Sequence, residues 1–152
     1  MTSPDAPATT DPDGAAGPAM VDWEAVAAGD ELPTSSQTAT LATSVAYAGA
    51  SGDLNPLHYD ADVASGISPT GGVIAHGMYS MGLASRLVTA WAGGPQHVAS
   101  IDTRFSRPWP LGATATVGGT VKEVDGDTVT VTLWVRNPDG KPILRGRAVV
   151  VR

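Results

Sequence analysis

The stretch from Thr128 to Asn137, TVTVTLWVRN, alternates apolar and polar side chains with a period of two residues. Successive side chains of a β-strand point to opposite faces of a sheet, so this period predicts a strand with one buried face. Turn signals flank the stretch on both sides, DGD at residues 125–127 and NPDG at residues 137–140. The end of the chain is therefore predicted to form antiparallel strands joined by tight turns.

A long helix is predicted ahead of these strands, from Gly77 to about Trp91. Arg86 is its only charged residue, so the helix is predicted to be largely buried. Apolar and small side chains recur along it at helical spacing: Met78, Met81, Ala84, Ser85, Val88 and Trp91. Helices followed by hairpin strands form an α+β layout, which a hot-dog arrangement explains best: a central helix wrapped by a curved antiparallel sheet. A second subunit is expected to cover the free edge of that sheet.

Shorter elements are predicted before the long helix. Residues 34–41 are polar and rich in threonine, which is typical of an edge strand. Two short helices are expected next, one capped by Thr43 and ended by Gly49, the other capped by Asp60 and ended by Gly66. The Pro-, Ala-, Gly- and Asp-rich residues 1–20 are predicted to be a disordered tail, which leaves residues 21–152 as one hot-dog domain.

Charge is unevenly distributed along this chain of net charge −6. Residues 1–85 contain ten acidic and no basic side chains, whereas residues 86–152 contain nine basic and five acidic ones. An acidic chain is a poor partner for nucleic acid, but its basic half can receive an acidic or phosphorylated partner. The chain has no cysteine, no bilayer-length apolar run and no leader pattern at its start, so a cytoplasmic protein without membrane contact is expected.

The segment SGDLNPLHYD, residues 51–60, contains the side chains best suited to catalysis. Asp53 and His58 are five residues apart in a loop that Pro56 stiffens, so both side chains can reach one point if the loop curls. A carboxylate and an imidazole at one point form a general acid–base pair. The Asn55 amide can fix a water molecule or the imidazole. Each of these residues is also common in turns, but the three together favour catalysis.

The N-terminus of the long helix is a second candidate site. Gly77 lies in the first turn, where free backbone N–H groups and the helix dipole attract an anion. Such an N–H can stabilise a carbonyl oxygen that becomes negative during reaction. The alternative, equally open, is that the glycine only allows close helix packing. His76 is interpreted as structural, because the sequence shows no acidic partner near it.

An acyl chain could lie along Met81, Ser85 and Val88, which share the helix face that begins at Gly77. Core packing is the commoner reason for such a stripe. No metal site is expected, because the three histidines are far apart in sequence and no HxxxH motif occurs. The chain also lacks glycine-rich phosphate loops and the GxSxG motif of serine hydrolases.

Two motifs carry a resemblance to a known family. YAGASGDLNPLHYD, residues 47–60, resembles the hydratase signature of the MaoC-like, (R)-specific enoyl-thioester hydratases and dehydratases, and IAHGMYSMG, residues 74–82, resembles their second signature. Two further segments, at 87–95 and 103–112, continue the likeness, which covers residues 39–152. It is strongest to the catalytic B subunit of actinobacterial (3R)-hydroxyacyl-ACP dehydratases.

This resemblance implies a hot-dog fold with Asp53 and His58 as catalytic residues, Asn55 as their support and the Gly77 N–H as oxyanion donor. The implied reaction is the dehydration of (3R)-hydroxyacyl thioesters, or the reverse hydration of trans-2-enoyl thioesters, in fatty-acid or polyketide-type metabolism. No cofactor is implied, since CoA or the phosphopantetheine of an acyl carrier protein carries the substrate. The implied assembly is a homodimer or a heterodimer with a second hot-dog subunit.

Two alternatives remain at this stage: a hot-dog acyl-thioesterase, and a non-catalytic subunit that binds acyl chains beside an active partner. The intact Asp53 and His58 argue against the second. If a carrier protein delivers the substrate, Arg86, Arg104 and Arg107 are the expected docking residues, because an acidic surface pairs with arginine.

Overall fold

The computed structural model describes residues 20–152, so the expected tail lies outside the described residues except for Met20. Five strands form one antiparallel sheet in the order β1-β3-β4-β5-β2. The strands are β1 (Ser35–Thr38), β2 (Val98–Phe105), β3 (Thr114–Asp125), β4 (Thr128–Arg136) and β5 (Pro142–Val151). The helices are α1 (Leu41–Ser51), α2 (Ala61–Ile67), α3 (Gly77–Trp91) and the 3-10 turns η1 (Pro56–His58) and η2 (Pro95–His97).

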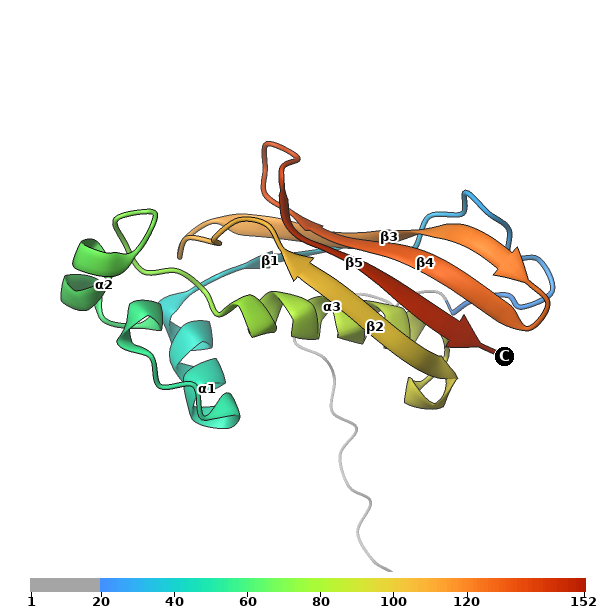
Figure 1. The fold of residues 1–152 in the computed structure, drawn as a ribbon, viewed down its shortest axis with the longest axis horizontal. Helices are drawn as coiled ribbons and strands as arrows, with labels where there is room; N and C mark the ends of the chain where they lie inside the picture. Colours follow the sequence, from blue (N-terminus) through green and yellow to red (C-terminus); the bar gives the residue numbers. More distant parts are fainter. Residues whose placement is uncertain (1–19) are drawn as a thin grey trace, which may run out of the picture.

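Helix α3 lies lengthwise against one face of this sheet (Figure 1), with the bounds that its sequence predicts. The predicted apolar face of β4 is the buried one: Val129, Val131, Leu133 and Val135 are at most 1% exposed. They pack with the sheet-facing side of α3, which includes Ala84, Val88 and Trp91. The predicted α+β hot-dog arrangement is thus confirmed, with an open sheet.

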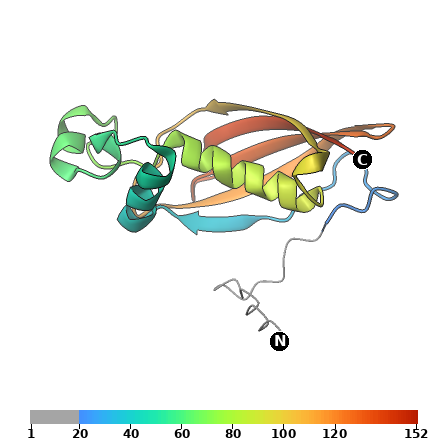
Figure 2. The same ribbon diagram turned by 90° about the horizontal axis from the view of Figure 1, so that it is seen from below.

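The prediction that α3 is largely buried holds only for the side of the helix that faces the sheet. Met78 is 52% exposed, and Gly82 and Arg86 are also exposed. The sheet covers only one side of the helix, so the residues on its other side face outward. Figure 2, seen from below, shows α1 and α2 grouped beyond the N-terminal end of α3. That end of the molecule holds the candidate site.

The two short helices form with shifted ends. Helix α1 begins one turn earlier than predicted, because Thr40 and not Thr43 is its N-cap. The two threonines form a capping box: the Thr43 N–H donates to the Thr40 Oγ1 at 3.1 Å, and the Thr40 N–H to the Thr43 Oγ1 at 2.9 Å. The helix continues past Gly49 to Gly52, which has a φ of 75° and ends it. In α2 the Asp60 cap is confirmed, and the helix ends at Ile67, one residue beyond Gly66.

Gly119 lies where two strands of the sheet approach each other closely, so a larger side chain at this position is expected to lower stability. A Cβ on Gly119 would lie 2.9 Å from the Thr132 carbonyl oxygen and 3.1 Å from a Leu133 methyl. Gly119→Ala is therefore expected to cost about 1–3 kcal/mol of unfolding free energy, as overpacked cores do. Gly49→Ala is the matched control, because nothing lies within 4 Å of its new Cβ. That change, inside α1, should be neutral or stabilise by up to about 1 kcal/mol. Equal denaturation midpoints for the two variants would contradict this account.

Candidate active site

The loop between α1 and α2 curls, which is the condition for Asp53 and His58 to reach one point. Asn55 caps η1, since its side-chain oxygen accepts a hydrogen bond from the Leu57 N–H at 3.1 Å, and Pro56 follows it. The Tyr59 hydroxyl donates to the Leu54 carbonyl at 2.7 Å and closes the loop on itself. The Asn55 side chain therefore stabilises the loop conformation, and the expected contact with a water or with His58 stays a prediction.

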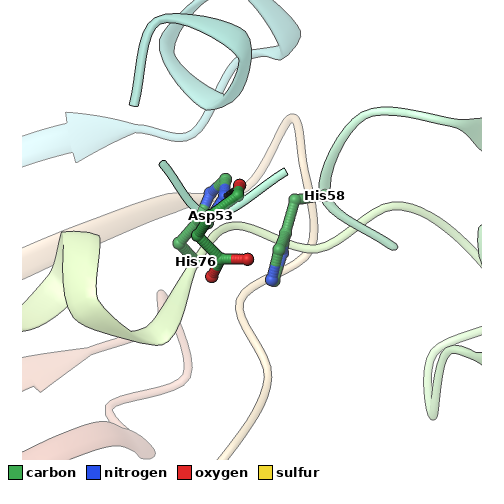
Figure 3. Close-up of side chains that lie close together, drawn as sticks. All are labelled: Asp53, His58 and His76. Carbon is green, nitrogen blue, oxygen red and sulfur yellow. Dashed lines mark hydrogen bonds between the residues drawn. The ribbon is translucent and has the colours of Figure 1, made fainter. Parts of the chain in front are cut away.

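Asp53 and His58 come together, as expected, and His76 joins them. One ligand atom from each of the three side chains lies within 4.8 Å of the other two (Figure 3). His58 is buried, whereas Asp53 is exposed. The His58 Nδ1 lies 2.8 Å from the Ile74 carbonyl oxygen, which can only accept, so Nδ1 carries the proton. Its Nε2 then has a free lone pair, as a general base requires.

His76 is closer to the candidate acid–base pair than its sequence indicates. Its ring stacks on the His58 ring with centroids 3.8 Å apart and an interplanar angle of 25°. Its Nε2 lies 3.1 Å from the Asp53 backbone oxygen. An Asp53 carboxylate oxygen also lies within 4.8 Å of a His76 ring nitrogen, so an acidic side chain is near His76, while its interpretation as structural stays a prediction. Sequence reasoning missed the contact because 23 residues separate the two positions.

A metal ion is the other ligand to consider for this cluster. In the described part of the chain, Asp53, His58 and His76 form the set of side chains that could hold one. On each imidazole one nitrogen is already bonded to a carbonyl oxygen, at Ile74 or Asp53. The rings lie face to face, so the lone pairs in their planes run side by side instead of converging on one point, as tetrahedral ligation needs. The geometry suits an acid–base cluster better than a metal site, and the absence of a metal stays a prediction.

Gly77 begins α3 beside this cluster. The preceding His76 is the N-cap residue but makes no side-chain capping bond, and the first N–H groups of a helix have no partner within it. Gly77 and His58 line one cavity of about 350 Å³. An imidazole base, a carboxylate and a free helix N–H thus gather at one end of the sheet.

The apolar wall of this cavity differs from the predicted acyl site. It is formed by Ile74, Phe105, Trp109 and Ile143, and none of the predicted residues Met81, Ser85 and Val88 lines it. Val88 is fully buried in the core, against which Met81 packs. Core packing accounts for that stripe, and an acyl chain beside it remains a prediction without support from the cavity. These residues come from three places, namely the segment before α3, the end of β2 with the loop after it, and the start of β5, and no periodic pattern identifies them.

The three candidate docking arginines lie on different elements. Arg107 lines the cavity, and its side chain donates to the Pro142 carbonyl at 3.1 Å. Arg104 lies on β2 directly opposite Arg145 of β5. Arg86 lies on the exposed side of α3.

Burial raises the pKa of the Tyr79 hydroxyl, an effect that the Arg86 charge opposes, so Tyr79 keeps its proton near neutral pH.

The hot-dog fold brings Asp53 and His58 together beside the N-terminus of α3. The chain belongs to the MaoC-like family: residues 24–139 match the family described as "MaoC like domain". In the described residues, no helix has the length and apolar character needed to cross a membrane.

Three known proteins are similar to the chain. It is 34% identical over 98 residues to the 3-oxo-4,17-pregnadiene-20-carboxyl-CoA hydratase beta subunit of Mycobacterium tuberculosis. The matched region covers 63% of this chain and 74% of that protein. The unliganded R-hydratase PhaJ1 from Pseudomonas aeruginosa superposes with a TM-score of 0.76 at 28% identity, over 85% of this chain and 83% of that one. The ChsH1-ChsH2 complex from Mycobacterium tuberculosis gives a TM-score of 0.72 at 29% identity, over 82% and 97% of the two chains.

Proposed function

We propose that this chain is a hydro-lyase that interconverts 3-hydroxyacyl and trans-2-enoyl thioesters. The observation that carries the proposal is a cavity lined by both His58 and Gly77, with an Asp53 carboxylate oxygen within 4.8 Å of a His58 ring nitrogen. Membership of the MaoC-like family supports hydratase or dehydratase chemistry on enoyl thioesters in general. The (3R) configuration, the fatty-acid or polyketide context and a cytoplasmic location remain predictions.

In the dehydration direction, the thioester oxygen accepts a hydrogen bond from the Gly77 N–H. His58 Nε2 removes the proton from C2, and the resulting enolate charge rests on the thioester oxygen, which the helix N-terminus stabilises. The Asp53 carboxyl group donates a proton to the C3 hydroxyl as the C3–O bond breaks, so water leaves and the C2–C3 double bond forms. Proton transfer from His58 back to Asp53 restores the starting state, and hydration follows the reverse path.

Assigning the base to His58 follows from its tautomer. The Nδ1–H is held by the Ile74 carbonyl, so the nitrogen that faces away from that bond accepts protons.

An assay of the purified chain with crotonyl-CoA tests the proposal against its alternatives. Hydration removes the conjugated double bond and leaves the thioester intact, which is the expected result. Release of free CoA without 3-hydroxybutyryl-CoA would instead identify a thioesterase. No reaction, alone and with co-expressed neighbouring hot-dog chains, would indicate a non-catalytic subunit.

We further propose that a second hot-dog chain covers the edge of β2, which is an outer strand of the described sheet. A curated relative is named as a beta subunit and a structural relative is a two-chain complex, which supports an assembly of two chains. Mass measurement of the chain expressed alone and with its neighbours distinguishes the homodimer from the heterodimer. A monomer in both preparations would contradict the assembly.

A carrier protein is the proposed donor of the acyl group, with Arg104 and Arg107 as docking residues. Arg104 of β2 lies directly opposite Arg145 of the neighbouring strand β5. Like charges in such a cross-strand pair are unfavourable unless an anion lies between or above them. Arg107, three residues further along the chain, lines the cavity. Arg86, on the exposed side of α3, remains the third predicted contact.

Charge reversal tests the docking surface. Arg104→Glu or Arg107→Glu should raise KM for a carrier-bound substrate several-fold and make it less sensitive to salt, with little change in kcat. A short acyl-pantetheine lacks the charged carrier, so its kinetics should not change. Lys122→Glu, the same reversal at an exposed position of β3, serves as the control. Equal losses with carrier and with pantetheine would show that these arginines support the fold instead.

A further inference from the structure

His76 is buried, unlike most of the loop that it contacts. Its side chain is 2% exposed, and its ring lies between elements that are distant in sequence. It stacks on His58, and it also packs against the Tyr47 ring of α1 with centroids 4.9 Å apart. The acid–base mechanism assigns no step to this imidazole.

The hydrogen bonds of His76 define its tautomer. The Asp53 backbone oxygen can only accept, so the Nε2 of His76 must carry a proton. The other nitrogen, Nδ1, is buried and has no hydrogen-bond partner among the described residues. A proton there would leave a charged, buried and unsatisfied donor, which is costly. His76 is therefore a neutral imidazole with its proton on Nε2.

The two histidines form a reciprocal pair of bonds. His58, from the loop of residues 52–60, donates to the carbonyl of Ile74, and His76, from the segment that enters α3, donates to the carbonyl of Asp53. Among the described residues, no other hydrogen bond joins the loop to residues 73–77. The stacked rings lie between them, so each imidazole holds the other segment in place.

We propose that His76 is a positioning residue, which ties the Asp53 main chain to the start of α3 and so sets the place of the Asp53 carboxylate against His58 and the Gly77 N–H. The inference rests on the proposed function, because it acts through the residues of that reaction. Gly77 follows His76 directly, so one bond fixes the distance between the carboxylate and the oxyanion donor. A displacement of about 1 Å at such a site can cost about 100-fold in rate.

Two substitutions separate the hydrogen bond from the stacked ring. His76→Phe keeps an aromatic ring against His58 but removes the donor, whereas His76→Gln can place an amide N–H near the former Nε2 without a ring. We expect His76→Phe to lower kcat for crotonyl-CoA hydration about 10–100-fold with little change in KM or melting temperature. His76→Gln should retain kcat within about threefold of the unmodified chain, because the tie to Asp53 remains.

A double-mutant cycle with Asp53→Asn shows whether His76 acts through Asp53. If it does, adding His76→Phe to Asp53→Asn should lower kcat little further, because the carboxylate that it positions is already absent. Additive losses in the double variant would overturn the proposal. So would an unchanged kcat in His76→Phe, or parallel falls of kcat and melting temperature in both His76 variants.

A measurement without substrate keeps this inference separate from the proposed reaction. NMR of the imidazole nitrogens in the unliganded protein should show His76 neutral with its proton on Nε2, and His58 with its proton on Nδ1. The His58 signals should shift in His76→Phe by more than in His76→Gln. A His76 proton on Nδ1, or on both nitrogens, would overturn the positioning role. The expected tautomers in a chain that leaves crotonyl-CoA unchanged would instead contradict the proposed reaction alone.

Discussion

Asp53→Asn and His58→Ala should each lower kcat for enoyl-thioester hydration by about 10²–10⁴, the range that positioned acid–base groups contribute. Asn keeps the size of Asp53 but cannot donate a carboxylic proton. Alanine at position 58 removes the Nε2 base together with the Nδ1–H bond to Ile74. Steady-state kinetics with crotonyl-CoA measure both effects.

The folding of these variants must be checked separately. Asp53 is exposed, so its replacement should leave the melting temperature nearly unchanged. His58 is buried, and for this position His58→Gln is the better structural control, since its amide can still donate to the Ile74 carbonyl. It should be as inactive as His58→Ala, because an amide is not a base. Near-normal turnover in Asp53→Asn or in either His58 variant would exclude the assigned acid–base pair.

Gly77→Pro should lower kcat by about 10²–10³, the cost of removing one oxyanion donor. Proline is well tolerated at the first position of a helix, where its missing N–H breaks no helical bond. The preceding residue, His76, has a φ of −58° and a ψ of 134°, a conformation that proline accepts at the position before it. The substitution thus removes the proposed donor and leaves α3 intact.

Gly77→Ala is the matched control for this experiment. Alanine keeps the N–H, and its Cβ would lie 3.4 Å from the Phe105 ring, an ordinary contact. Activity within a few-fold of the unmodified chain is expected, with the same melting temperature as Gly77→Pro. If alanine and proline reduce kcat equally, the glycine is needed for space beside Phe105, and the oxyanion role is wrong.

The parts of the fold with strong periodicity could be predicted from the sequence. The alternation in β4 and the long apolar stripe of α3 are patterns of residues close together in sequence. Each pattern therefore identifies its element and the face of that element that is buried. The ends of α1 could not, because Thr40 and Thr43 are equally good caps and only the reciprocal bond decides between them. The exposure of Met78 depends on which side of α3 the sheet covers, which is a tertiary property.

The candidate site divides in the same way. Asp53, His58 and Gly77 lie in two short motifs, so their chemistry is readable before their geometry is known. The stacking of His76 on His58 arises only when the segment before α3 crosses the loop after α1. The apolar wall of Phe105, Trp109 and Ile143 forms where the end of β2 meets the start of β5, and no local pattern connects these residues.

Hydration of crotonyl-CoA in D2O, followed by NMR, tests the assigned reaction. The expected product is 3-hydroxybutyryl-CoA with one deuterium at C2 and an intact thioester, because His58 delivers a solvent-derived deuteron to C2, the carbon that it deprotonates in dehydration. Gly77→Pro should form the same product at least about 100-fold more slowly. Free CoA accompanied by unchanged crotonate, or 3-hydroxybutyryl-CoA formed equally fast by His58→Gln, would contradict the account.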